Sequence, residues 1–99
     1  MKKSDVPRLS PMKLKGRPGT LFQTPYDEQY VAQLKGLIRD KRDRWFNEHR
    51  RGWWIAEEHV DLVTHLTRET FGAMRIVDAD GHEIIEERSG ERLEQGRLL

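Results

Sequence analysis

Residues 39–55 combine cationic and aromatic side chains more densely than the rest of the chain. They hold six of the eighteen basic residues and all three tryptophans. The cations are Arg39, Lys41, Arg42, Arg44, Arg50 and Arg51, and the large aromatic residues are Trp45, Phe46, Trp53 and Trp54. Guanidinium groups neutralise phosphates, and flat aromatic faces stack on bases or anchor a protein interface. The chemistry that this segment predicts is therefore binding rather than catalysis.

Other residue types that carry chemistry lack the spacing that the chemistry requires. His59 and His65 are six residues apart, whereas paired zinc ligands on a helix are usually three or four apart. Asp78-Ala-Asp80-Gly81 begins like a calcium loop but is not followed by the bidentate glutamate that completes one. Gly16-Arg-Pro-Gly19 lacks the Lys-Ser/Thr of a phosphate loop, and no Gly-x-Ser-x-Gly occurs. We expect no catalytic residue, no metal and no cofactor, so the protein is not expected to be an enzyme.

Length and composition favour one small domain with additional unpacked chain. The chain has 99 residues, of which 35% are apolar and 35% are charged, and this apolar fraction is low for a globular protein. The absence of cysteine excludes a disulfide scaffold. No apolar run approaches the ~20 residues that span a bilayer, and no signal peptide is visible. We therefore expect a cytoplasmic protein without membrane contact.

The net charge of +1 hides a segregation of charge along the chain. Residues 1–19 carry six cations against Asp5, a net charge of +5. From Gly52 onward there are five arginines and eleven carboxylates, a net charge of −6. This distribution indicates one surface that faces a polyanion and one that is solvated or repels it. The proline, glycine and lysine content of residues 1–19 predicts a flexible basic arm, and residues 87–99 read as a mobile acidic tail.

The elements that must position these side chains follow from hydrophobic periodicity and turn residues. Apolar spacing predicts amphipathic helices over 27–38 and 57–71, the second ended by Gly72. Short β-prone segments cover 20–24, 44–46, 53–55, 73–77 and 82–85. The predicted fold is a small α+β domain over 20–86, in the order β-α-β-β-α-β-β, with antiparallel hairpins packed on two helices.

The predicted hairpin over 44–55 has two faces, which we assign by alternation. Trp45, Trp53 and Ile55 are placed on the core side, and Arg44, Phe46 and Trp54 on the binding side. The alternative is that all three tryptophans form the core of a small domain and the arginines only make its rim soluble. Four large aromatic side chains on alternating positions cannot all point inward, so we expect at least Phe46 or Trp54 to be exposed.

Several motifs together resemble a known family. They are Thr24-Pro-Tyr-Asp27, the helix after it, Arg44-Trp-Phe-Asn47, Gly52-Trp-Trp-Ile55 and the helix that follows. Residues 24–71 resemble the small HARP-like module, which is found beside the motor of annealing helicases and in short stand-alone proteins of phages and plasmids. The resemblance implies binding to DNA, including branched or single-stranded forms. It would place Arg44, Trp45, Arg50, Arg51 and Trp53 in the family's hairpin. The doubled Trp53-Trp54 and the segment 73–85 depart from the family pattern.

We therefore expect a small non-enzymatic nucleic-acid-binding protein of a phage or other mobile element, with DNA favoured over RNA as its partner. The predicted contact residues are Arg42, Arg44, Phe46, Arg50, Arg51 and Trp54 of the hairpin region, with Lys13, Lys15 and Arg17 of the arm. The alternative is a protein-interaction module that binds and modulates a host enzyme, since tryptophan and arginine also dominate protein hot spots. That alternative gives the acidic C-terminal half a use.

Overall fold

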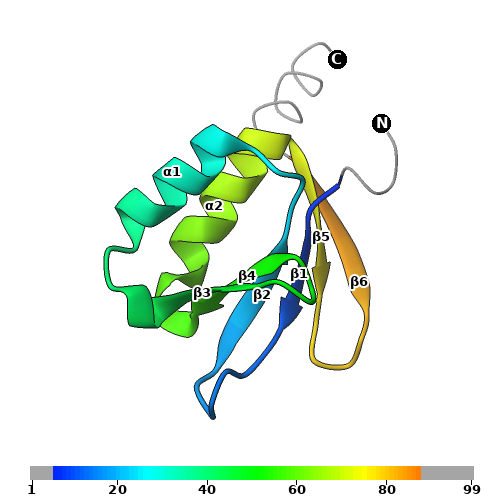
Figure 1. Cartoon of the computed structure of the whole chain (residues 1–99). Helices are drawn as coiled ribbons and strands as arrows, with labels where there is room; N and C mark the ends of the chain where they lie inside the picture. Colours follow the sequence, from blue (N-terminus) through cyan, green and yellow to red (C-terminus); the bar gives the residue numbers. More distant parts are fainter. Residues whose placement is uncertain (1–5, 88–99) are drawn as a thin grey trace.

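Six strands form one sheet with two helices against one of its faces in the computed structural model, which describes residues 6–87 (Figure 1). The strands are β1 (Arg8–Pro11), β2 (Gly19–Gln23), β3 (Arg44–Asn47), β4 (Gly52–Ala56), β5 (Ala73–Val77) and β6 (Glu83–Glu87). Their order across the sheet is β3-β4-β2-β1-β5-β6. Neighbouring strands are antiparallel except β1 and β5, which are parallel. The predicted α+β class is confirmed, with one more strand at the start of the chain.

Helix α1 (Glu28–Leu37) begins and ends close to the predicted positions. Asp27 caps its first turn, because the carboxylate accepts a hydrogen bond of 2.8 Å from the backbone N–H of Tyr30. Tyr30 and Leu34, one turn apart, are the buried residues of the helix. Ile38, directly after it, is also buried. The apolar stripe seen in the sequence is therefore the face that α1 turns to the core.

Helix α2 (Val60–Phe71) follows a single 3-10 turn at Glu57–His59 and ends at Gly72, whose φ of 83° is left-handed. Thr67 is buried on its inner face, where its hydroxyl donates to the carbonyl of Val63 (2.7 Å). The Tyr30 hydroxyl donates in turn to the Thr67 oxygen (2.8 Å), which joins the two helices. Burial of the phenol raises the pKa of Tyr30 to about 12 despite that hydrogen bond.

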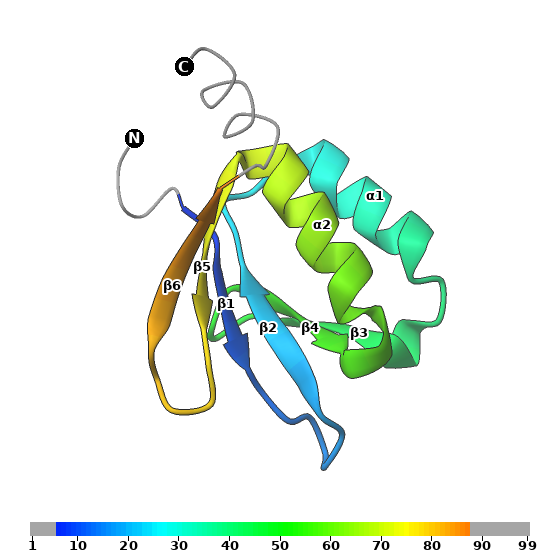
Figure 2. The same cartoon turned by 180° about the vertical axis from the view of Figure 1, so that it is seen from behind.

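The core lies between the two helices and the sheet face that they cover. The sheet contributes Leu9, Phe22, Ile55 and Met74, and the helical side contributes Tyr30, Leu34, Ile38 and Val63. Both helices lie on the same side of the sheet in Figure 1 and in Figure 2, and within residues 6–87 no helix covers the opposite face. Because side chains alternate along a strand, the neighbours of the core residues point to this helix-free face. Arg8, Leu21, Trp54 and Arg75 are such neighbours.

The flexible basic arm predicted over 1–19 is wrong for the residues that the structure describes. Leu9 is only 3% exposed, and β1 pairs with β2 on one side and with β5 on the other. Pro7 and Pro11 make this short strand difficult to predict from the sequence, because proline is rare inside central strands. After β1 the chain makes a tight turn in which Lys15 and Gly16 have φ angles of 51° and 84°. Residues 1–5 and the predicted tail beyond Glu87 lie outside the described range.

Candidate functional site

The register of the β3–β4 hairpin decides which aromatic side chains share a face. Trp45 lies opposite Trp54, and Phe46 lies opposite Trp53. Trp45 and Trp54 therefore share the helix-free face, while Phe46 and Trp53 face the helices with Ile55. The predicted grouping of Trp45 with Trp53, and of Phe46 with Trp54, is wrong. Asn47 also pairs with Gly52, so each strand is one residue longer than predicted, but the register is the one that the predicted strands imply. The error lies in the faces, because residues directly opposite each other in an antiparallel pair point to the same side of the sheet.

Trp54 is a structural residue. Its side chain has no exposed surface, and its indole N–H donates to the carbonyl of Met12 (2.9 Å). The guanidinium of Arg17 lies 5.6 Å from the ring centroid. The ring also rests on Gly19, where a Cβ atom would come within 2.6 Å of the indole nitrogen. The β1–β2 connection thus covers Trp54, and the predicted stacking role of this residue is wrong.

Trp45 occupies the exposed position that was expected for Trp54. It is 45% exposed and lies at a hollow of about 520 Å³ on the helix-free face. We call the lining residues the Trp45 cluster: Leu14, Lys15, Arg17, Lys41, Arg42, Trp45 and Trp54. Four cations from two distant segments thus line one hollow together with Trp45. Lys15, Arg17 and Arg42 were predicted as contact residues, whereas Trp45 was assigned to the core and Lys41 was left out.

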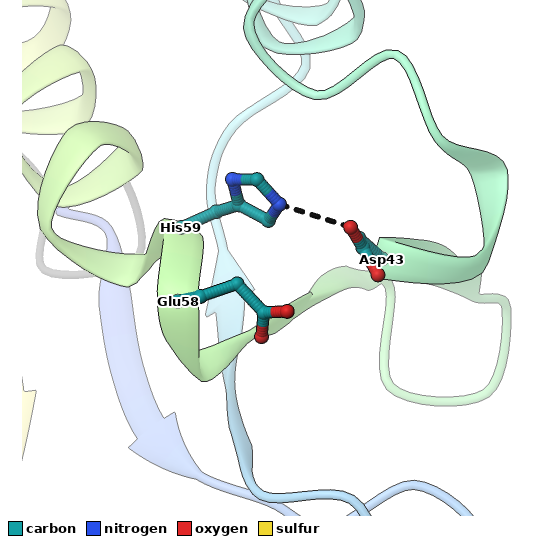
Figure 3. Close-up of side chains that lie close together, drawn as sticks. All are labelled: Asp43, Glu58 and His59. Carbon is teal, nitrogen blue, oxygen red and sulfur yellow. Dashed lines mark hydrogen bonds and ion pairs between the residues drawn. The ribbon is translucent and has the colours of Figure 1, made fainter.

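A hydrogen-bonded network around Asp43 links the two basic segments, and Figure 3 shows Asp43 with two of its neighbours, Glu58 and His59. Asp43 accepts from Arg17 (3.0 Å) through one carboxylate oxygen and from His59 Nε2 (3.0 Å) through the other. Glu58 also reaches Arg17, at 3.5 Å. Asp43, Glu58 and His59 are close enough to share a cation. However, both oxygens of Asp43 already have partners, so we interpret the group as a structural network.

Asp40 and Arg42 form a second, local pair. The carboxylate of Asp40 accepts from the backbone N–H of Arg42 (2.9 Å) and from its guanidinium (2.9 and 3.2 Å). These hydrogen bonds lower the pKa of Asp40 to about 2. The pair holds the turn that leads from α1 into β3 and orients Arg42 toward the hollow. Lys15 and Lys41 have no carboxylate within 4.0 Å in the described part of the chain.

We expect the stability of the fold to decrease between pH 5 and pH 2.5 partly because of Asp43. Its hydrogen bonds with His59 and then Arg17 lower the pKa of Asp43 below its usual value. A carboxyl with a lowered folded-state pKa stabilises the fold above its unfolded pKa, and this contribution is lost as the pH falls through the folded one. Urea unfolding at both pH values should show a smaller difference for Asp43→Asn than for the unmodified protein. Asp61→Asn, at an exposed position on α2, is the control. If both variants reduced the stability difference between the two pH values equally, Asp43 would not be its specific source.

Four arginines line a second hollow, of about 440 Å³, toward the other end of β2 and β4. We call Arg8, Arg50, Arg51 and Arg75 the arginine cluster; Val6, Gln23, Thr24 and Pro25 complete the lining. Gln23 donates to the carbonyl of Arg50 (2.8 Å) and ties the β3–β4 loop to the sheet. Arg50 and Arg51 were predicted as contact residues, and the fold adds Arg8 and Arg75, which come from strands remote in sequence.

A third hollow, of about 530 Å³, lies on the helix side of the β3–β4 hairpin. We call it the aromatic hollow; it is lined by Phe22, Thr24, Pro25, Tyr26, Val31, Phe46, Glu48, Arg51, Gly52 and Trp53. Tyr26 is 84% and Phe46 42% exposed. The rings of Phe46 and Trp53 meet edge to face, 5.4 Å between centroids. The prediction that Phe46 is exposed is correct, but Phe46 lies on the face opposite to the Trp45 cluster.

The remaining predicted contact residues lie outside these hollows. Arg44 faces the helices, where its Nε donates to the carbonyl of Ile38 (2.8 Å) and its guanidinium lies 6.0 Å from the Trp53 ring. Its predicted place beside Trp54 on the binding face is therefore wrong. Lys13 is exposed in the β1–β2 connection but lines none of the three hollows.

Two loop cations hold an uncommon backbone conformation. Within residues 6–87, the non-glycine residues with positive φ are Lys15, at 51°, and Arg51, at 53°. Glycine and asparagine adopt this left-handed conformation more easily than long side chains do. Lys15 lines the Trp45 cluster, and Arg51 lines both the arginine cluster and the aromatic hollow. Strained residues of this kind often mark functional positions.

No protein-family model matches the chain, and neither the curated proteins nor the solved structures that were searched contain a match. The resemblance to the HARP-like module therefore rests on the sequence motifs alone and stays a prediction. Among residues 6–87, no helix is long and apolar enough to cross a membrane.

Proposed function

We propose that the protein binds nucleic acid on the helix-free face of its sheet, with the Trp45 cluster as the principal contact. The observation that carries the proposal is that four cations and the half-exposed ring of Trp45 line one hollow; the cations are Lys15, Arg17, Lys41 and Arg42. Aromatic rings stack on any base, and cations track the phosphates beside it. The hollow has the volume of a small-molecule site and can take one base with its sugar.

The four cations have different roles in this proposal. Arg17 and Arg42 are ion-paired with Asp43 and Asp40, so much of their charge is already balanced. Lys41 and Lys15 are the cations whose charge is left to attract phosphate. Stacking and phosphate contacts hardly distinguish one base from another, so the affinity should depend only weakly on the nucleotide sequence. We favour DNA over RNA, and a phage or other mobile element acting in the cytoplasm, on the resemblance described above.

Reversing the charge of Lys41 tests the proposal against its matched control on the opposite face. Lys41→Glu is expected to weaken binding of an unphosphorylated oligonucleotide roughly tenfold and to reduce the salt dependence by about one phosphate contact. With Lys15 and Lys41 as the engaged cations, the unmodified protein should show a log–log slope of about −2. Lys35→Glu makes the same charge change on α1, on the helix side near Trp53, and should change affinity less than about threefold. Fluorescence anisotropy at several salt concentrations measures the affinity of the unmodified protein and of both variants.

Two results would contradict the proposal. Equal losses in Lys41→Glu and Lys35→Glu would mean that net charge, not the Trp45 cluster, attracts the oligonucleotide. Alternatively, a nuclease-treated pull-down from host lysate could recover one stoichiometric protein whose binding is lost in Lys41→Glu. Together with absent oligonucleotide binding, that result would favour the protein-interaction module.

A further inference from the structure

The aromatic hollow and the arginine cluster adjoin each other and lie apart from the Trp45 cluster. Both are lined by Thr24, Pro25 and Arg51, whereas the hollow of the Trp45 cluster shares no lining residue with either. A ligand lying across Arg51 would contact aromatic rings on one side and guanidinium groups on the other. This composite surface is not used in the function proposed above.

The arginine cluster is suited to a phosphate group. Arg8, Arg50 and Arg51 have no carboxylate within 4.0 Å among residues 6–87, and Arg75 has only Glu83, at 3.9 Å. The buried Nε of Arg75 has no hydrogen-bond acceptor in the same range. Converging guanidinium groups bind phosphate strongly because they offer paired N–H donors and a fixed positive charge. The charge of this cluster is therefore less balanced than that of Arg17 and Arg42.

The aromatic hollow is suited to a flat ring with polar edges. Tyr26, Phe46 and Trp53 supply ring surface, and the volume of about 530 Å³ is that of a small-molecule site. Glu48 and Thr24 place a carboxylate and a hydroxyl on the same lining. A carboxylate accepts hydrogen bonds from the amino and imino groups of bases, as it does from cytosine in DNA complexes. A nucleobase satisfies both the apolar and the polar parts of the hollow.

The backbone of Arg51 supports a ligand-binding role for its side chain. Asn47 accepts from the backbone N–H of Arg50 (3.1 Å) and closes the loop, which leaves Arg51 at φ 53°. Hairpin loops of this length favour glycine at the left-handed position. Arginine there works against the local conformation, so its side chain is better explained by a contact than by the fold.

We propose that the aromatic hollow and the arginine cluster together bind a phosphorylated nucleotide. The base lies in the aromatic hollow, the phosphate lies at the arginine cluster, and Arg51 spans the two. The same chemistry is found in a free nucleotide and in the phosphorylated 5′ end of a strand. The proposal stands independently of the Trp45 cluster.

Arg51→Gly and Lys15→Gly form a matched pair that tests this site. Each removes one cation and relieves one left-handed residue, but they lie in different hollows. Isothermal titration of each variant with ATP, AMP and adenosine covers the free nucleotides. Anisotropy with one oligonucleotide, with and without a 5′-phosphate, covers the strand end. Thermal unfolding of each variant controls for folding.

Arg51→Gly should weaken binding of the phosphorylated ligand at least tenfold, while its unfolding temperature stays equal or rises. Lys15→Gly should leave the binding of ATP and AMP unchanged, and should leave the ratio between the affinities of the 5′-phosphorylated and 5′-hydroxyl oligonucleotides unchanged. For a free nucleotide, ATP or AMP should bind at least tenfold tighter than adenosine. For a strand end, the 5′-phosphorylated oligonucleotide should bind at least tenfold tighter than its 5′-hydroxyl form. The proposal is overturned if the phosphate adds nothing in either series. It is also overturned if Arg51→Gly and Lys15→Gly weaken nucleotide binding equally, or reduce the advantage of the 5′-phosphate equally. If the Trp45 cluster did not bind nucleic acid, Arg51→Gly would still weaken binding of the phosphorylated ligand, so the two proposals fail separately.

Discussion

Replacement of Trp54 by alanine is expected to lower the free energy of unfolding by about 3–5 kcal/mol, the usual cost of emptying a buried tryptophan site. The ring is completely buried, and its removal also leaves the carbonyl of Met12 without its hydrogen bond. Since domains of this size are stable by only about 5–15 kcal/mol, a loss of this size would leave part of the population unfolded. Urea titration followed by far-UV circular dichroism measures the change.

Trp54→Phe separates packing from hydrogen bonding at this position. Phenylalanine fills most of the space over Gly19 but cannot donate to Met12, so we expect a smaller loss, of about 1–2 kcal/mol. A loss below about 1 kcal/mol in Trp54→Ala would contradict the structure, because it would mean that the β1–β2 connection does not cover the ring.

Replacement of Trp45 by alanine is expected to reduce the affinity for nucleic acid strongly but the stability of the fold only slightly. Trp45 lies directly opposite Trp54 on the neighbouring strand but is half exposed. Its removal should cost less than about 1 kcal/mol of stability, as is usual for surface positions. If the ring stacks on a base, affinity for an unphosphorylated oligonucleotide should fall roughly tenfold to a hundredfold, since one stacked base contributes about 1–3 kcal/mol. Anisotropy and urea unfolding of the same preparation give both quantities.

Phe46→Ala is the matched control for Trp45. The two residues are neighbours on β3 with nearly equal exposure, 42% and 45%, but they point to opposite faces. Phe46→Ala should leave the affinity for the unphosphorylated oligonucleotide unchanged, and Trp45→Phe should retain most of it. Equal losses for Trp45→Ala and Phe46→Ala would argue against a binding site confined to the helix-free face.

The elements with strong local signals could be predicted from the sequence. Asp27 before the first apolar stripe and Gly72 after the second fixed the ends of α1 and α2 to within a few residues. The Asp80-Gly81 turn located the hairpin of β5 and β6 in the same way. β1 escaped prediction because its four residues include a proline and because one of its two partner strands, β5, is remote in sequence. Such long-range pairing leaves no periodic pattern in so short a strand.

The candidate site was predicted in its chemistry but not in its arrangement. The basic and aromatic composition of residues 39–55 identified the region, and Arg42, Lys15 and Arg17 do meet in one hollow. The predicted hairpin has the observed register, but its faces were assigned strand by strand, which put Trp45 with Trp53 although Trp45 lies opposite Trp54. Residues opposite each other in an antiparallel pair share a face, so this assignment exchanged Trp45 for Trp54 and misplaced Phe46. Arg8 and Arg75 become adjacent only through the parallel pairing of β1 with β5.

The place of β1 in the sheet has a consequence for how the protein is made. Within residues 6–87, β1 is the strand that connects β3-β4-β2 to β5-β6. It leaves the ribosome before every other described strand, yet its parallel partner β5 is synthesised only after both helices. The edge of β1 that pairs with β5 therefore stays without its partner strand during most of translation. Unpaired strand edges are prone to misfolding and aggregation. A recombinant fragment that starts at Thr20 would lack this strand altogether, and its sheet would separate into two parts that no hydrogen-bonded strand joins.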